Sequence, residues 1–152
     1  MPGPEGDRLL YVNMTDQTTS FEPFPEEWKL LGGRGLSAKI LNKECDPTCD
    51  PLGPDNVLVM APGVLSGTTA PTSGRISIGA KSPLTHGIKE ANAGGNPGQH
   101  LMKLNIRAIV VKGKPADPEK RYGLRIDEKG VSVVAADDYK GMWNYALCEK
   151  LL

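Results

Sequence analysis

The chain has 152 residues, of which 39% are hydrophobic and 24% are charged, as expected for a single soluble globular domain. Its 18 basic and 18 acidic residues give a formal net charge of zero, which argues against a partner such as nucleic acid or an anionic membrane surface. No apolar run is long enough to span a bilayer, and the first ten residues, MPGPEGDRLL, lack a secretion signal, so we expect a cytoplasmic protein.

The N-terminal segment predicts a β-hairpin. Residues 8–14 (RLLYVNM) carry apolar side chains at every second position from Leu10, which is typical of a strand. In residues 19–24 (TSFEPF), Pro23 lacks a backbone donor and therefore indicates an edge strand. Only a short polar turn separates the two strands, so we expect them to pair.

Two helices and a buried strand are predicted next. Residues 24–31 (FPEEWKLL) place a proline and two glutamates where a helix would begin, which favours a short helix that the glycines of residues 32–35 (GGRG) end. Residues 35–45 (GLSAKILNKEC) have apolar side chains on one face and predict a longer helix. The apolar run in residues 56–61 (NVLVMA) is typical of a buried strand.

The middle of the chain is rich in turn-forming residues. An irregular stretch at 62–74 precedes an alternating strand at 75–81 (RISIGAK), and residues 87–92 predict another extended segment. Residues 90–101 read EANAGGNPGQHL, and we expect a short helix over residues 96–104. The chain contains 18 glycines and 13 prolines, which indicates that loops carry its function.

The remaining residues predict three strands and a final helix. These elements are a strand at 107–113, a hairpin of residues 122–127 and 130–136, and a helix over 137–152 capped by Asp137 or Asp138. The apolar face of this helix comprises Met142, Ala146, Leu147 and Leu151. Because that face needs a partner, we expect residues 1–152 to be the N-terminal domain of a longer protein, and the isolated chain to self-associate as a homo-oligomer.

The predicted elements together define the fold class. About seven strands and three or four helices, without a regular alternation of the two, predict an α+β fold. Several strands follow one another as hairpins, so we expect a mixed, mostly antiparallel sheet with a few short helices.

The common catalytic signatures are absent from the sequence. It contains no P-loop, no nucleophile elbow and no complete dinucleotide fingerprint around the glycines of residues 32–35 or 93–98. His86 and His100 each lie near a turn or a helix start, and we interpret both as surface residues rather than catalysts.

The three cysteines, Cys45, Cys49 and Cys148, are predicted to be free thiols. An odd number of cysteines argues against a disulfide framework. Cys45 and Cys49 form a C-x3-C in CDPTC, whereas metal sites more often use C-x2-C, and no neighbouring His or Cys completes a set of four ligands.

Three segments are candidates for ligand binding. Arg75 follows Gly74 at the start of a predicted strand, where its guanidinium could reach a ligand or could be a surface cation. The run SGTTAPTSG (66–74) could hold a phosphate, although its composition favours a surface loop. In residues 92–95 (NAGG), the glycines allow close backbone approach, so the segment could present N–H groups to an anion or carbonyls to a hard cation, or could simply be a tight turn.

Five segments, in this order and spacing, are characteristic of one family. They are LLGGRGLSAKIL (30–41), DPTCDPLGPDNVLVMAPGVLSGTTAPTSGR (46–75), KSPLTHG (81–87), ANAGGNPGQHLM (91–102) and IRAIVVKGK (106–114). From about Gly6 to its end, the chain therefore resembles the N-terminal domain of the aldehyde ferredoxin oxidoreductases, which are tungsten- or molybdenum-pterin enzymes.

The resemblance implies a role for the candidate residues. In this family the N-terminal domain forms a base of two β-sheets beneath two pterin molecules, whose dithiolenes hold the metal. By resemblance, Arg75 contacts a pterin or its phosphate, and Asn92, Ala93, Gly94 and Gly95 contact the bis-pterin through backbone atoms. The Asn92 carbonyl also helps to hold a Mg²⁺ ion that bridges the two phosphates. Ala93 occupies a position where the family often has serine.

The resemblance also implies an activity for the complete protein. Such an enzyme oxidises an aldehyde to a carboxylic acid with water and passes two electrons through a 4Fe–4S cluster to ferredoxin. The cluster cysteines lie beyond the N-terminal domain, and Cys45, Cys49 and Cys148 do not match them, so this chain alone is expected to be inactive. Two alternatives remain: a non-catalytic domain that binds a pterin or phosphate or serves as a partner subunit, and a related reductase of thioester-linked aromatic acids.

Overall fold

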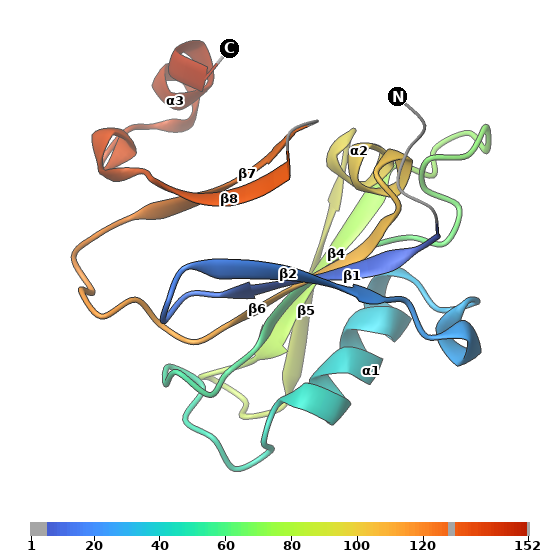
Figure 1. The fold of residues 1–152 in the computed structure, drawn as a ribbon, viewed down its shortest axis with the longest axis horizontal. Coiled ribbons are helices and arrows are strands. Elements are labelled where there is room, and N and C mark those ends of the chain that lie inside the picture. The colour runs from blue at the N-terminus through green and yellow to red at the C-terminus, as the bar shows by residue number, and fades with distance from the viewer. Residues whose placement is uncertain (1–5, 128–129, 152) are drawn as a thin grey trace.

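The computed structural model describes residues 6–127 and 130–151, which fold into two β-sheets and several short helices (Figure 1). The strands are β1 (Arg8–Asn13), β2 (Thr18–Pro23), β3 (Leu58–Pro62), β4 (Arg75–Lys81), β5 (Ile88–Gly94), β6 (Ile106–Lys112), β7 (Tyr122–Asp127) and β8 (Gly130–Ala135). The α-helices are α1 (Gly33–Glu44), α2 (Pro97–Lys103) and α3 (Asn144–Leu151), and two 3-10 helices are η1 (Glu26–Trp28) and η2 (Asp137–Tyr139). The predicted α+β class is confirmed.

The larger sheet has the strand order β2-β1-β6-β3-β4-β5, and β7 and β8 form the second sheet. Strands β1 and β6 are parallel, whereas every other pair of neighbouring strands is antiparallel, so the predicted mixed and mostly antiparallel arrangement is confirmed. Strand β6 lies in the interior of the sheet, and its first five residues are buried, which explains why its sequence is apolar except for Arg107 and Lys112.

The larger sheet has a hydrophobic core on each face. Helix α1 covers one face, where Leu36 and Ile40 pack in a cluster with Val59 and Val110. On the opposite face, Leu101 of α2 and partly buried side chains of the β7–β8 hairpin join a second cluster. Figure 1 shows α1 on one side of the sheet and both α2 and the hairpin on the other. Each fully buried leucine or valine in these clusters contributes about 1.5–3 kcal/mol to folding.

The first predicted helix is shorter than expected. Residues 24–31 contain only the single 3-10 turn of η1, because the carbonyls of Lys29 and Leu31 accept hydrogen bonds from Arg107 Nη2, at 3.3 and 3.1 Å. The buried guanidinium of Arg107 therefore takes acceptors that a continuing helix would use. Burial of Trp28 against the α1 cluster fixes the segment in this conformation.

The glycine-rich segment 32–35 begins the longer helix, whereas the sequence predicted that it would end the preceding one. Gly33 and Arg34 belong to the first turn of α1, and Gly32 is its N-cap. A Cβ atom on Gly32 would lie 2.5 Å from the backbone nitrogen of Val64. Gly32 is therefore required for the close approach of the 62–74 loop to the start of α1.

The C-terminal helix is also shorter than predicted. Residues 137–139 form η2, Gly141 adopts a positive φ of 81°, and α3 begins only at Asn144. Asp137 does not cap a helix, because its Oδ1 accepts the backbone N–H of Arg121 at 2.8 Å. None of the described residues of α3 is buried, and Trp143 and Tyr145 are 87% and 89% exposed. In the described part of the chain, no helix has the length and apolarity to cross a membrane.

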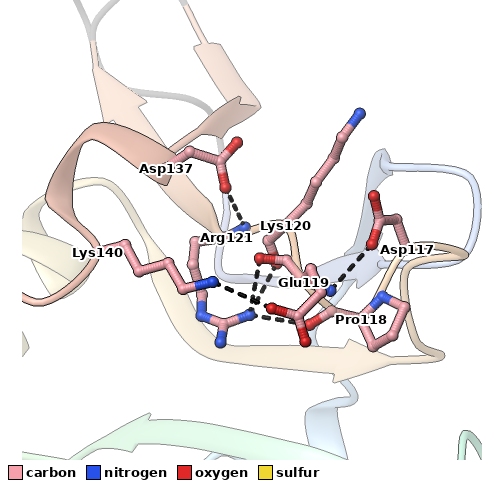
Figure 2. Close-up of polar contacts among 7 residues, drawn as sticks. All are labelled: Asp117, Pro118, Glu119, Lys120, Arg121, Asp137 and Lys140. Atoms are coloured by element: carbon pink, nitrogen blue, oxygen red, sulfur yellow. Dashed lines mark hydrogen bonds and ion pairs between the residues drawn. The ribbon is translucent and has the colours of Figure 1, made fainter.

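A polar cluster fixes the linker between β6 and the β7–β8 hairpin. Figure 2 shows the Arg121 guanidinium turned back onto its own preceding backbone, where Nη1 donates to the carbonyls of Pro118, Glu119 and Lys120 at 2.9, 3.2 and 3.2 Å. Lys140 forms an ion pair with Glu119 at 3.1 Å. The cluster thus links the start of β7 to the segment that follows β8.

We expect Arg121→Ala to loosen this linker without unfolding the domain. Losing a charged donor to three carbonyls should speed amide hydrogen exchange at residues 119–121 about fivefold, whereas the free energy of global unfolding should change by less than about 0.5 kcal/mol. Lys140→Ala is the matched control, because it removes only an exposed ion pair, which typically contributes little. Unchanged exchange in Arg121→Ala would contradict a structural role for the cluster.

Candidate functional site

The antiparallel pairing of β4 with β5 brings the predicted binding residues together. Arg75 pairs with Gly94, and Ser77 pairs with Asn92, so the start of β4 lies beside the end of β5. Ala93 falls between these two pairs, opposite Ile76, and Gly95 directly follows the strand. The five residues singled out from the sequence therefore occupy one end of the β4–β5 edge of the sheet.

One of the three guanidinium nitrogens of Arg75 donates a hydrogen bond within the protein, and the other two are available to a ligand. Its Nε donates a hydrogen bond to Asn92 Oδ1. No protein group in residues 6–127 and 130–151 accepts a hydrogen bond from its two terminal nitrogens, and the residue is exposed. A Cβ atom on Gly94 would lie 3.7 Å from Nη1, so glycine leaves the space beside the guanidinium open. This forked donor can therefore bind an anion such as a phosphate.

Glu90 organises the site, although no sequence pattern pointed to this residue. Its Oε1 accepts hydrogen bonds from Ser77 Oγ at 2.8 Å and from Asn92 Nδ2 at 3.5 Å. Its Oε2 accepts one from Arg34 Nε at 3.2 Å. The carboxylate therefore links β4, β5 and the first turn of α1, and through Asn92 it also positions Arg75.

Arg34, Ser77 and Glu90 could not be grouped from the sequence, because Arg34 and Glu90 are 56 positions apart. The alternation of β4 does place Arg75 and Ser77 on one face, and this is the one local signal that pointed to the cluster. Ser77 is fully buried, so its hydroxyl acts as a structural donor and not as an accessible nucleophile.

The hydrogen bond from Ser77 and the positive charge of Arg34 lower the pKa of Glu90 below its ordinary value of 4.5, against an opposing effect of burial. Because the pKa is lowered in the folded state, the carboxylate stabilises the fold above pH 4.5. That contribution is lost as the pH falls through the folded-state pKa.

Glu90→Gln is therefore expected to destabilise the protein at neutral pH and to have little effect in acid. Chemical denaturation of both proteins at about pH 7 and about pH 3 measures the difference, because neutral glutamic acid and glutamine are similar in size and charge. A difference in unfolding free energy that stays constant between these pH values would contradict a role for the Glu90 charge.

Glycines allow the backbone around Arg75 to pack closely. A Cβ atom on Gly74 would lie 2.5 Å from the carbonyl oxygen of Gly95, and one on Gly98 would lie 2.9 Å from that of Arg75. Gly95 has a φ of 117°, which side-chain-bearing residues rarely adopt. Because these glycines have no side chain, the start of α2 can pack closely against the start of β4, and space remains open beside Arg75.

Most hydroxyl groups of the 66–74 loop donate to backbone carbonyls of the loop or of the residue before it. The buried Ser66 donates to the carbonyl of Ser73 at 2.7 Å, Thr68 donates to Leu65 at 2.6 Å, and Ser73 donates to Ala70 at 2.8 Å. These contacts agree with the structural loop that the composition favours over a phosphate-binding cradle.

The other candidate residues lie outside strands β4 and β5, with His86 in the turn that joins the two strands and His100 in α2. His86 and His100 are both exposed, as the sequence predicts. Cys45 and Cys49 are unbridged and half-buried, and Cys148 is exposed. Within residues 6–127 and 130–151, no group of three or more His, Cys, Asp or Glu side chains is placed to hold a metal ion.

The site therefore combines two guanidinium groups with one carboxylate beside glycine-rich backbone. Arg34 and Glu90 form an ion pair of 3.2 Å, which leaves the charge of Arg75 uncompensated. Strand β5 is also an edge strand of the sheet, so its backbone groups that point away from β4 have no strand partner among the described residues. Such an arrangement is suited to binding a ligand that is both anionic and rich in hydrogen-bonding groups.

Comparisons with known proteins identify one family. The family model described as "Aldehyde ferredoxin oxidoreductase, N-terminal domain" matches residues 9–152. Tungsten-containing aldehyde ferredoxin oxidoreductases from Pyrococcus furiosus and Thermococcus kodakarensis are 47% and 46% identical to the chain over 117 residues. Each of these matches covers 76% of the chain and 19% of the relative, so the chain spans about a fifth of the length of these relatives.

Two further proteins are similar over nearly the whole chain. An aliphatic sulfonate oxidoreductase, WOR-like subunit, of Pyrococcus furiosus is 31% identical over 150 residues, which are 95% of the chain and 23% of that protein. Among solved structures, the active site complex BamBC of benzoyl coenzyme A reductase with 1,5-dienoyl-CoA superimposes with a TM-score of 0.87 and 27% identity. That match covers 95% of the chain and 22% of the solved chain.

Proposed function

This chain belongs to the aldehyde ferredoxin oxidoreductase family, and from that membership we propose that its β4–β5 edge binds a bis-pterin cofactor. The metal of that cofactor is tungsten in this proposal, as in the names of the relatives that are 47% and 46% identical, with molybdenum as the alternative. Arg75, Asn92, Ala93, Gly94 and Gly95 are the proposed contact residues.

The observation that carries this proposal is the free guanidinium fork of Arg75 beside Gly94. Its two terminal nitrogens have no acceptor among the described residues, and they are the donors that a pterin phosphate would need. Gly94 and Gly95 leave room for a bulky ring to approach the backbone. A carbonyl oxygen on the edge strand, which we propose to be that of Asn92, suits a Mg²⁺ ion between the phosphates. The residues present therefore fit the group.

The protein's share of the chemistry is binding and orientation. When bound, the metal–dithiolene group would supply the redox chemistry. Glu90 holds Asn92 through a hydrogen bond of 3.5 Å, and Asn92 in turn holds Arg75, so the donors are positioned before any ligand arrives. Removing one of these supports should weaken binding even where the direct contacts remain.

For the complete protein we propose the oxidation of aldehydes to carboxylic acids with water, with ferredoxin as electron acceptor. The names of the relatives at 47% and 46% identity support this substrate class and this acceptor. The 4Fe–4S cluster that such electron transfer uses is expected beyond residues 1–152, so this chain is proposed to be inactive by itself.

The test is a metal and pterin analysis of the full-length protein, purified without oxygen from cells supplied with tungstate and molybdate. We expect bound tungsten or molybdenum, bound pterin, and ferredoxin reduction that depends on an added aldehyde. Arg75→Ala should lower the retained pterin about tenfold, since a charge-assisted hydrogen bond contributes about 1.5–3 kcal/mol. A protein without tungsten, molybdenum or pterin would refute the proposal.

A second candidate is a reductase that acts on aromatic acids linked to a thioester. The superposition on the benzoyl coenzyme A reductase complex, with a TM-score of 0.87, favours it. The higher sequence identity of 47% to an aldehyde ferredoxin oxidoreductase makes it the less favoured of the two. Parallel assays with aldehydes and aromatic thioesters separate them, and bound pterin without turnover of either substrate would indicate the non-catalytic alternative.

A further inference from the structure

A pair of cysteines lies at the end of α1, at the opposite end of that helix from the Arg34–Glu90 ion pair. The sulfur atoms of Cys45 and Cys49 are 3.6 Å apart. A disulfide bond is about 2.05 Å long, so the two sulfurs would have to approach by only about 1.6 Å, a movement within reach of a side-chain rotation.

The short turn between the two cysteines is fixed by its own hydrogen bonds. Asp46 Oδ1 accepts the backbone N–H of Thr48 at 2.7 Å and its hydroxyl at 2.6 Å. The backbone N–H of Cys49 donates to the carbonyl of Asp46 at 3.1 Å, which closes the turn. These bonds direct both cysteine side chains toward the same side of the segment.

A buried lysine donates hydrogen bonds to backbone carbonyls of the same turn. Lys81 Nζ donates to the carbonyls of Pro47 and Cys49, both at 2.6 Å, and the residue is only 7% exposed. Asn56 Oδ1 lies 3.8 Å from Cys45 Sγ and also accepts the backbone N–H of Lys81 at 3.1 Å. The surroundings therefore fix the dithiol in a geometry close to that of a bridged pair.

The pair is also accessible to small molecules. Both cysteines are half-buried, and Cys45 lines a cavity of about 150 Å³ together with Leu41, Lys81 and His86. Burial, with the neighbouring Cys45 as a further cause, raises the pKa of the Cys49 thiol. Of the two cysteines, Cys45 lines the cavity, so a small molecule that enters it meets Cys45 first.

We propose that Cys45 and Cys49 form an oxidisable dithiol site, which a small-molecule disulfide converts into a Cys45–Cys49 disulfide by thiol–disulfide exchange. The Cys45 thiolate attacks one sulfur of the small disulfide, which forms a mixed disulfide and releases a thiolate. Cys49 then loses its proton and attacks the Cys45 sulfur, which releases the second thiolate. The protein gives up two electrons and two protons, and the small disulfide becomes two thiols.

The oxidised bond can be read from one peptide, because no Lys or Arg lies between Glu44 and Arg75. The full-length protein is incubated without oxygen in mixtures of reduced and oxidised glutathione, acidified, alkylated, digested with trypsin and analysed by mass spectrometry. We expect the peptide of residues 44–75 to be two hydrogens lighter and unalkylated in oxidising mixtures. A peptide that stays doubly alkylated, or that carries only glutathione or a bridge to another cysteine, would refute the proposal.

Two neighbouring aspartates provide a matched comparison for the role of the turn. Asp46→Ala removes the side-chain acceptor inside the Cys45–Cys49 ring and should lower the equilibrium constant for bridge formation about fivefold, or about 1 kcal/mol. Asp50→Ala removes a similar acceptor outside the ring, because Asp50 Oδ1 accepts the backbone N–H of Leu52 at 3.0 Å. Its equilibrium constant should equal that of the wild type. Equal equilibrium constants for bridge formation in the two variants would contradict the proposal that the turn preorganises the two cysteines.

Discussion

Replacing Gly94 and Gly95 with valine in the full-length protein is expected to abolish retention of pterin and metal. Valine rarely adopts the φ of 117° found at Gly95, and forcing it there costs about 1–3 kcal/mol of backbone strain. At Gly94 the added side chain would begin 3.7 Å from Arg75 Nη1 and occupy the open space beside the guanidinium. Both effects act on the proposed binding surface, so retention should fall by at least about tenfold.

Gly87→Val is the control for this double variant. It adds the same side chain to the turn before β5, at the opposite end of the β4–β5 hairpin. A Cβ atom there would lie 3.9 Å from the nearest atom outside its immediate neighbours, Thr85 Oγ1, so this variant should fold and retain the cofactor. If the double variant also keeps its metal and pterin, residues 92–95 form an ordinary turn and the proposed site is wrong.

The strands of this fold were largely predictable because their signals are local. The predicted bounds of β4 and β7 agree with the structure, and those of β6 differ by one residue at each end. In each case the alternation of side chains or a continuous run of β-branched residues marks the strand. The α+β class followed from these strands and needed no tertiary information.

The helix boundaries were harder to predict, because they depend on distant groups. The glycines at 32–35 could end one helix or begin the next, and the close packing of Gly32 on Val64 decides between the two. Asp137 has a typical N-cap sequence, but its carboxylate binds the N–H of Arg121, 16 residues earlier. Neither contact can be recognised from the local sequence pattern, because each joins residues that are distant in the chain.

The residues of the candidate site also differ in whether they could be predicted from the sequence. Family resemblance singled out Arg75 and residues 92–95, and the strand pairing places them side by side. Glu90 and Arg34 were missed because their contact depends on how α1 packs across β4 and β5. A side chain that supports a binding residue is recognised only once the elements carrying both are placed, whereas a binding residue can belong to a motif.

Gly74→Ala should be the most damaging single-methyl change at this junction. The new Cβ would lie 2.5 Å from the carbonyl oxygen of Gly95 and 3.1 Å from Gln99 Nε2. A backbone carbonyl cannot move aside as a flexible side chain can, so we expect a loss of about 1–3 kcal/mol in unfolding free energy. Because the displaced carbonyl belongs to Gly95, pterin retention should fall together with stability.

Gly35→Ala is the matched change in α1. Its Cβ would lie 3.9 Å from the nearest atom, Leu31 Cδ2, and alanine favours a helix over glycine, so stability should rise by about 0.5 kcal/mol. Chemical denaturation compares the two variants, and pterin content gives a second readout for Gly74→Ala. Normal stability in Gly74→Ala would mean that the 73–75 backbone can shift away from Gly95. Lost stability with normal pterin content would mean that this glycine supports the fold without contributing to the binding surface.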